Sequence, residues 1–382
     1  MLPEVLPYHL SVRDHFKKHS SVWEFFAAAH TREEQLGAFQ TELLKNKSPL
    51  RRETDPGVYE QIDLVLDRLG LGQLSVTAWQ AADADEFEWN AGIVYLHQEA
   101  HLVFCGPIRQ QLNDAEMLAV IAHELTHIRL YTALDGELEV VDRIITAIAN
   151  HPGSEPPYDE TARLFKIYAE IYCDRGAYAV LGDSDPIITG LSKIATGLPG
   201  ENATTPTHPK NFIRARAIRL WQDQGAAADP DIAKMIEGPA DLHRLDVFSQ
   251  SALHTLTREV LLELLQPDWV RTAGVLGLAQ QYFPGLSWPG NSDTGVRERL
   301  ITALENAEPG IHEYFSYLLL DLALADPSLE NQLAGQVIAF AEEVRLAAVF
   351  EPICKKEMQF GEKKWQQYKQ SALAAWHDVR SV

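Results

Sequence analysis

Cysteine is scarce in this sequence. The 382 residues include three cysteines, Cys105, Cys173 and Cys354, which lie far apart and form no Cys-x-x-Cys pair. An odd and scattered set argues against a disulfide framework and against a zinc cluster built from cysteine alone. Such cysteine usage is typical of the reducing cytosol, so we expect a cytoplasmic protein.

Basic residues are also in deficit, with 33 lysines and arginines against 54 acidic residues and a net charge of −21. A surface of this sign repels phosphate backbones and anionic lipids, so nucleic acid is not an expected partner. The sequence has no run of about 18 uncharged apolar residues that could span a bilayer. Its N-terminal stretch MLPEVLPYHLSVRDHFKKHS lacks the basic start and apolar core of a signal peptide. We therefore expect no membrane insertion.

The sequence does have enough apolar residues for large cores, since 46% of it is hydrophobic. Its length suits two or three compact units. Turn-forming residues divide it into a helical segment at 1–54, a mixed part at 55–224 and a helical part at 232–382. The stretches LSVTAWQ (74–80) and GIVYLHQEAHLVFCG (92–106) predict strands, the second as a hairpin or two successive strands. The expected fold class is α+β, mostly helical with a small sheet.

One predicted helix carries polar side chains inside an apolar stretch. The sequence MLAVIAHELTHIRLY covers residues 117–131, within a helix expected at about 114–130. His123 and His127 are four residues apart, so they share one helix face and can bind one zinc ion. Glu124 is offset by one position and can take a proton from a water molecule on that ion. This is the His-Glu-x-x-His arrangement of metallopeptidases, and the alternative is a histidine pair satisfied by solvent or carboxylates.

A catalytic zinc site needs a third protein ligand. The sequence after His127 has no histidine at the spacing of the longer His-Glu-x-x-His-x-x-Gly-x-x-His motif, so that ligand must come from elsewhere. The predicted helix around YAEIYCDRGAYAV (168–180) offers Glu170 and Asp174 on one face. Glu170 can bind the metal, while Asp174 can accept a hydrogen bond from a ligand histidine. The alternative is a solvated acidic face, which the neighbouring Ile171 disfavours.

Four short sequences, taken together and in this order, resemble one known family. They are NAGIVYL (90–96), HELTH (123–127), EIYCDRGA (170–177) and THPKNFIRAR (207–216). They resemble the HtpX and CaaX-prenyl-protease class of zinc metallopeptidases, the gluzincins of metallopeptidase family forty-eight. The resemblance covers roughly residues 55–222 and implies a zincin-like metallopeptidase core, followed here by the helical C-terminal domain.

The resemblance implies a role for each residue of the motif. His123, His127 and Glu170 would be the ligands of one zinc ion per chain. Glu124 would be the general base. Asp174 would support the site without binding the metal.

The resemblance also implies a place for the substrate. Asn90 and Ala91 match an Asn-Ala pair that precedes an edge strand in the family. The strand near 101–105, which contains Val103, would be the edge on which an extended peptide adds as a further strand.

Four further positions complete the comparison with the family. His208 would stabilise the oxyanion of the tetrahedral intermediate or orient the site. Arg214 would have a structural role or close the site. Two residues depart from the family pattern: Cys173 stands in place of an alanine, and we interpret it as a packing residue, while Gly92 replaces an aromatic residue.

These patterns predict a zinc-dependent metalloendopeptidase that hydrolyses peptide or unfolded protein substrates by a water molecule that Glu124 activates. The helical C-terminal domain is a candidate surface for a protein partner. The alternative is a catalytically inactive or latent metal-binding protein whose C-terminal domain binds that partner. In the latent form, a loop such as 151–158 or the C-terminal helices would cover the active site.

Overall fold

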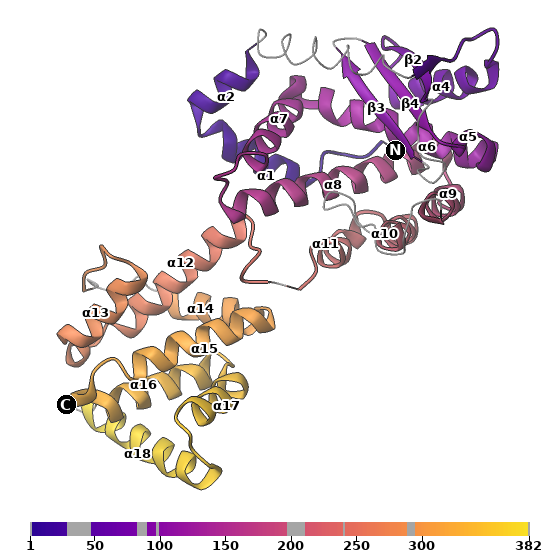
Figure 1. Ribbon diagram of the computed structural model, residues 1–382. Coiled ribbons are helices and arrows are strands. Elements are labelled where there is room, and N and C mark those ends of the chain that lie inside the picture. The colour runs from indigo at the N-terminus through magenta and orange to yellow at the C-terminus, as the bar shows by residue number, and fades with distance from the viewer. Residues whose placement is uncertain are drawn as a thin grey trace. The chain divides into compact units, whose positions relative to one another are not determined.

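A computed structural model describes the chain over residues 2–28, 47–81, 90–96, 99–196, 211–239, 241–288 and 295–380 (Figure 1). The chain divides into two compact units, Met1–Gly238 and Pro239–Val382, and each is described by itself. Both units are built mainly from helices, and the first also contains a small sheet. No helix within the described ranges is long and apolar enough to cross a membrane.

The sheet of the first unit has four strands, in the order β1-β2-β4-β3. The strands are β1 (Lys47–Pro49), β2 (Ser75–Ala81), β3 (Asn90–Leu96) and β4 (Glu99–Cys105). β2 and β4 are parallel, whereas the other neighbours are antiparallel, so the sheet is mixed. A mostly helical chain with a small sheet confirms the expected α+β class, and β3 with β4 forms the expected antiparallel pair.

β4 lies inside the sheet, between β2 and β3. Val103 of β4 faces Trp79 of β2 on one side and Gly92 of β3 on the other. The prediction that residues 101–105 form the sheet edge is therefore wrong. The physical reason is that β2 pairs with β4 in parallel on one side while β3 pairs with it on the other, so both edges of β4 are occupied. Within the described residues, β3 is the edge strand beside β4.

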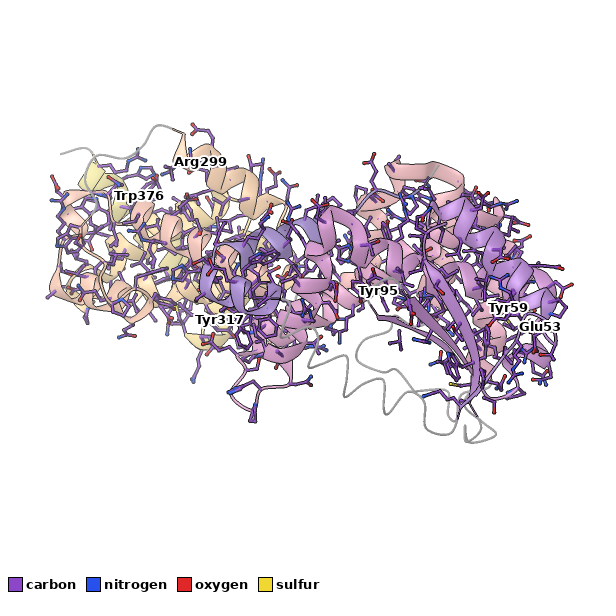
Figure 2. The ribbon with its side chains drawn as sticks, turned by 90° about the horizontal axis from the view of Figure 1, so that it is seen from above. Glu53, Tyr59, Tyr95, Arg299, Tyr317 and Trp376 are labelled. Carbon is purple, nitrogen blue, oxygen red and sulfur yellow. The ribbon has the colours of Figure 1, made fainter. Side chains whose placement is uncertain are left out.

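The first unit also contains helices in its described part. In chain order they are α1 (Pro7–Lys17), α2 (Ser20–Ala27), α4 (Pro56–Leu69), α5 (Ile108–Gln111), α6 (Asp114–Thr132), α7 (Glu137–Ala149), α8 (Pro156–Leu181), α9 (Asp185–Thr196), α10 (Asn211–Gln224) and α11 (Asp229–Glu237). Helix α4 is tied to the sheet by Tyr59 (Figure 2), whose hydroxyl donates to the Leu50 carbonyl at 2.8 Å and accepts from the Ala78 N–H of β2 at 3.3 Å.

The beginning of α6 is fixed by a capping box. The side chain of Asn113 accepts from the Glu116 N–H at 3.0 Å, and the Glu116 carboxylate accepts from the Asn113 N–H at 2.9 Å. Such a cap stabilises a helix by about 1 kcal/mol. Ile121, Leu125 and Ile128 then bury one face of α6 in the core. The cap and the apolar face together set the position of the residues between them.

Helices α6 and α8 approach closely because Gly176 has no side chain. A Cβ atom at Gly176 would lie 2.3 Å from Oγ1 and Cγ2 of Thr126. Thr126 is fully buried, and its hydroxyl donates to the Ala122 carbonyl at 2.6 Å, so its position is fixed. This contact brings residues 123–127 of α6 beside residues 170–174 of α8.

The second unit is helical over its described residues. Its helices are α12 (Val247–Leu264), α13 (Ala273–Tyr282), α14 (Val296–Glu305), α15 (Pro309–Ala323), α16 (Glu330–Glu343), α17 (Ala347–Glu357) and α18 (Glu362–Arg380). α16 and α18 pack at close range, since a Cβ at Gly335 would lie 2.1 Å from the Ala372 carbonyl oxygen. Trp365 of α18 is buried in this core, and it anchors α18 there.

Candidate metal centre

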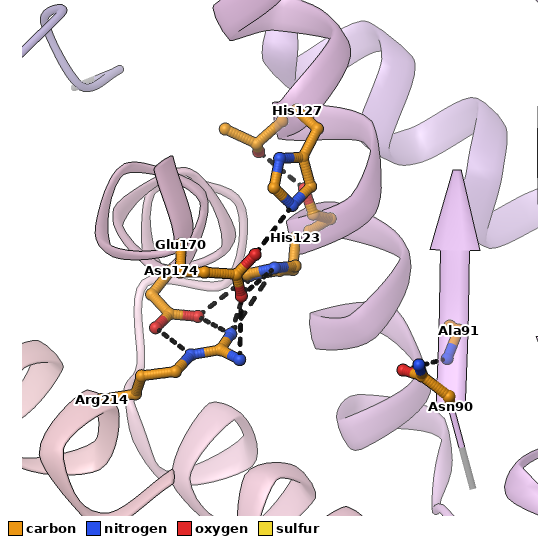
Figure 3. A network of polar contacts seen from close by, with 9 residues as sticks. Asn90, Ala91, His123, His127, Glu170, Asp174 and Arg214 are labelled. Atoms are coloured by element: carbon orange, nitrogen blue, oxygen red, sulfur yellow. Dashed lines mark hydrogen bonds and ion pairs between the residues drawn. The ribbon is translucent and has the colours of Figure 1, made fainter. Parts of the chain in front are cut away.

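Two histidines of α6 and a glutamate of α8 converge on one point (Figure 3). The imidazole rings of His123 and His127 are 5.1 Å apart between centroids and nearly perpendicular, at 81°. Nε2 of His123 lies 3.4 Å from Oε2 of Glu170, and Nε2 of His127 lies 3.5 Å from Oε1 of the same carboxylate. All three predicted ligands are thus close together, although they come from two helices.

These distances have the spacing of ligands around one ion. A good N–H···O hydrogen bond is about 2.7–3.2 Å long, shorter than either contact of Glu170. Two donors bound to one tetrahedral ion at about 2.0–2.1 Å each lie roughly 3.3 Å apart. Nitrogen and carboxylate oxygen are also the atoms that zinc binds in such sites. The residues present therefore fit a metal ion.

Cys173 belongs to the same group of atoms. The ligand atoms of His123, His127 and Cys173 all lie within 4.8 Å of one another, a group that can hold a metal ion. Cys173 is fully buried, as expected for a packing residue, but its thiol also faces the two histidines. Cys173 follows Glu170 by three residues, so the two side chains lie on the same face of α8. This spacing could have indicated from the sequence that the thiol lies near the histidines.

Asp174 supports His123 through the ring nitrogen that does not face Glu170. Nδ1 of His123 donates to Oδ1 of Asp174 at 2.9 Å. This bond orients the ring and directs Nε2 toward Glu170, where an ion would bind. Asp174 is almost completely buried, so no solvent competes for its carboxylate.

Arg214 of α10 holds both carboxylates. Its guanidinium donates to Asp174 through Nε at 2.9 Å and through Nη2 at 2.6 Å, and Nη1 lies 3.0 Å from Oε2 of Glu170. A planar guanidinium suits such a paired contact better than an ammonium group does. Arg214 is itself buried and its pKa is raised by the two carboxylates, although burial alone would lower it.

The buried charges shift the pKa values of the acids and of His123. Burial raises the pKa values of Glu170 and Asp174, but the charge of Arg214 and the histidine contacts outweigh it, so both are lowered. Burial and Arg214 lower the pKa of His123, but its contacts with Asp174 and Glu170 raise it to about 10. A proton therefore stays on His123 in the metal-free protein, and an ion must displace it from Nε2.

Glu124 lies next to these residues but outside their network. Its side chain is half-buried and makes no hydrogen bond with a residue in the described ranges. Burial raises the pKa of its carboxyl group, although His123 and His127 act in the opposite direction. A carboxylate with a raised pKa can hold a proton during a reaction near neutral pH.

Two further residues beside His127 were missed by the sequence analysis. Tyr131 stacks on the His127 ring, with centroids 6.3 Å apart and planes 21° apart. Asp142 of α7 interacts electrostatically with His127, and its buried Oδ1 has no hydrogen-bond partner among the described residues. Tyr131 follows His127 by four residues, so helical spacing could have found it, whereas Asp142 reaches the site only through tertiary packing.

The remaining predicted residues that the structure describes are not part of this cluster. His208 lies outside the described residues. Asn90 and Ala91 are on β3 (Figure 3), where the Asn90 side chain accepts from the Ala91 N–H at 2.9 Å. Val103 is buried in β4. The structure therefore brings together the predicted metal ligands and their supporting residues, while the predicted substrate residues lie in the sheet.

Comparisons with known proteins give no relative. No protein-family model matches the chain, and neither the curated proteins nor the solved structures contain a significant match. The functional argument therefore rests on the geometry of the site, and the resemblance described above stays a prediction.

Proposed function

We propose that this protein is a zinc-dependent metalloendopeptidase with a zincin-like core. His123, His127 and Glu170 would hold one zinc ion. The observation that carries the proposal is the pair of contacts, at 3.4 and 3.5 Å, between the two histidine Nε2 atoms and the Glu170 carboxylate. Two nitrogens and one carboxylate are a donor set of catalytic zinc sites, which keep a fourth position open.

The bound ion would polarise the scissile carbonyl group and make water acidic near neutral pH. Glu124 then acts as the general base and takes a proton from the attacking water. The same carboxyl group passes this proton to the nitrogen of the leaving amine. The raised pKa of Glu124 supports both steps, because the group must accept and release a proton at similar pH.

Asp174 and Arg214 position the site in this proposal. Asp174 keeps the His123 ring in one orientation and one tautomer. Arg214 fixes Asp174 through two hydrogen bonds and neutralises part of the negative charge of the two carboxylates. Neither residue needs to touch the substrate for this role.

An extended peptide is the substrate that the sheet favours. β3 pairs with β4 on one side and is one of the two edge strands of the described sheet, with β1 at the other edge. A peptide can add to such an edge through main-chain hydrogen bonds, which read an extended backbone and little of its sequence. Asn90 and Ala91 begin this strand, which supports the substrate-binding role proposed for them.

The test is hydrolysis of an unfolded protein that carries a quenched fluorophore. Glu124→Gln should lower the rate at least about 100-fold, the contribution of a general base, while zinc content stays unchanged. Glu60→Gln is the matched control, since Glu60 lies exposed on α4. Measurable hydrolysis at equal rates by wild type and Glu124→Gln, with zinc bound in both, would reject the peptidase mechanism.

A specific observation favours the second candidate, a latent metal-binding protein. The thiol of Cys173 faces the same two histidines as Glu170 does. A further ligand at this position would occupy the place that a catalytic site keeps for water.

A further inference from the structure

We propose that the Cys173 thiolate is a fourth protein ligand of the ion held by His123, His127 and Glu170, and that it closes the site in the resting protein. The inference rests on the proposed function, because it concerns the regulation of the same site. The peptidase mechanism needs three protein ligands and one open position on the ion for water. With Cys173 bound, all four positions are occupied by protein.

The distances bring Cys173 within reach of the ion. Its Sγ lies within 4.8 Å of the ligand atoms of His123 and His127. In a tetrahedral site with Zn–S near 2.3 Å and Zn–N near 2.0–2.1 Å, sulfur and nitrogen are roughly 3.6 Å apart. The difference is at most about 1.2 Å, which is within the reach of a cysteine side chain that moves toward a bound ion.

The thiol lies beside the two histidines and has no other polar partner among the described residues. Cys173 is fully buried, and within the described residues its Sγ makes no hydrogen bond. Burial and the nearby carboxylates of Glu170, Glu124 and Asp174 raise the pKa of this thiol, so a bound ion would have to displace its proton. A small apolar residue would fill the same space, but it would leave the two histidines and one carboxylate as the only ligands.

The charges also balance in the closed site. A divalent ion is neutralised by the Glu170 carboxylate and the Cys173 thiolate, while Arg214 is neutralised by Asp174 through two hydrogen bonds. Four protein ligands are the arrangement of structural zinc sites, whereas catalytic sites have three. The single side chain of Cys173 therefore decides which of the two kinds of site this protein has.

The experiment is absorption spectroscopy of the full chain loaded with Co²⁺ in place of zinc. A thiolate bound to Co²⁺ gives an intense charge-transfer band in the near ultraviolet, which nitrogen and oxygen ligands do not give. We expect this band in wild type and its loss in Cys173→Ala and in Cys173→Ser, with Co²⁺ still bound. Cys354→Ala, in the second unit, is the matched control and should keep the band.

The outcomes separate this inference from the proposed function. Stoichiometric Co²⁺ binding by wild type without the band would overturn the inference and leave the three-ligand metal site standing. Failure of wild type to bind Co²⁺ or zinc would reject the proposed function itself. A separate measurement tests whether Cys173 closes the site. If it does, Cys173→Ala should hydrolyse unfolded protein faster than wild type. Equal hydrolysis by the two proteins would overturn closure, even if the band is present.

Discussion

His123 and Asp174 are joined by a 2.9 Å hydrogen bond between Nδ1 and Oδ1, although 51 residues separate them in the sequence. This bond decides which nitrogen of His123 can face an ion. Because Asp174 occupies Nδ1, Nε2 is directed at Glu170, which is 3.4 Å away. The orientation of the first ligand thus depends on a residue that does not itself face the ion.

Asp174→Asn should weaken zinc binding by roughly 10- to 100-fold, the usual cost of losing a group that orients a metal ligand. The amide cannot act as the same acceptor for both His123 and Arg214. Competition with a chromogenic chelator measures the change. Asp185→Asn is the matched control, because Asp185 is exposed and pairs with Arg219. This variant should bind zinc as wild type does. Unchanged affinity in Asp174→Asn would mean that the hydrogen bond does not position His123.

Arg214→Met should destabilise the metal-free protein by about 3–5 kcal/mol, because two buried carboxylates lose their cation. The free energy of unfolding in urea, measured with a chelator present, reports this loss. Saturating zinc should recover part of it, since the ion supplies positive charge beside Glu170. Arg219→Met, which removes an exposed arginine of the same helix, should change stability little. An equal loss with and without zinc would show that the ion does not compensate for the missing charge of Arg214.

Gly176→Ala should separate α6 from α8, because the added Cβ would lie 2.3 Å from side-chain atoms of Thr126. Overpacking of this kind costs about 1–3 kcal/mol in stability. It should also weaken zinc binding, since Glu170 moves with α8. Gly57→Ala on α4, where a Cβ meets nothing within 4 Å, is the control glycine substitution. Wild-type stability and zinc affinity in Gly176→Ala would contradict the close helix contact.

The buried His9 side chain should make the folded protein less stable in mild acid. Burial lowers its pKa from 6.5 to about 4, although a hydrogen bond to the Phe165 carbonyl acts in the opposite direction. The unfolded chain therefore binds this proton more readily, so stability is complete above pH 6.5 and falls as the pH drops toward 4. The loss reaches about 2 kcal/mol at pH 5 and about 3 kcal/mol below pH 4.

Urea unfolding at pH 7.5 and at pH 5 tests this prediction in wild type and in His9→Gln. The glutamine keeps an N–H donor but does not titrate, so its stability should fall less between the two pH values. If both proteins lose the same free energy of unfolding, His9 is not the group responsible.

Much of the candidate site could be predicted because it follows local rules. His123 and His127 share a helix face by spacing alone, and the pair Glu170 and Asp174 does so on a second helix. The strand stretches were found from their β-branched residues. Each of these signals lies within one segment of the chain, where sequence periodicity is informative.

The missed features depend on packing between distant segments. β4 lies inside the sheet because β2 pairs with it in parallel, and no local pattern states which strands become neighbours. Asp142 reaches His127 only because α7 packs beside α6. Cys173 was interpreted as a packing residue from its size, and its approach to the histidines depends on how deeply α6 and α8 interlock at Gly176.

Zinc content measured by elemental mass spectrometry tests the central claim most directly. The full chain, loaded with zinc and dialysed against a chelator, should retain about one ion per chain. Glu170→Ala treated in parallel should lose most of it, because the remaining ligands bind more weakly, whereas Glu124→Gln should retain it. No zinc in wild type after loading and dialysis would contradict a metal centre formed by α6 and α8, and equal retention in Glu170→Ala would contradict Glu170 as a ligand of that centre.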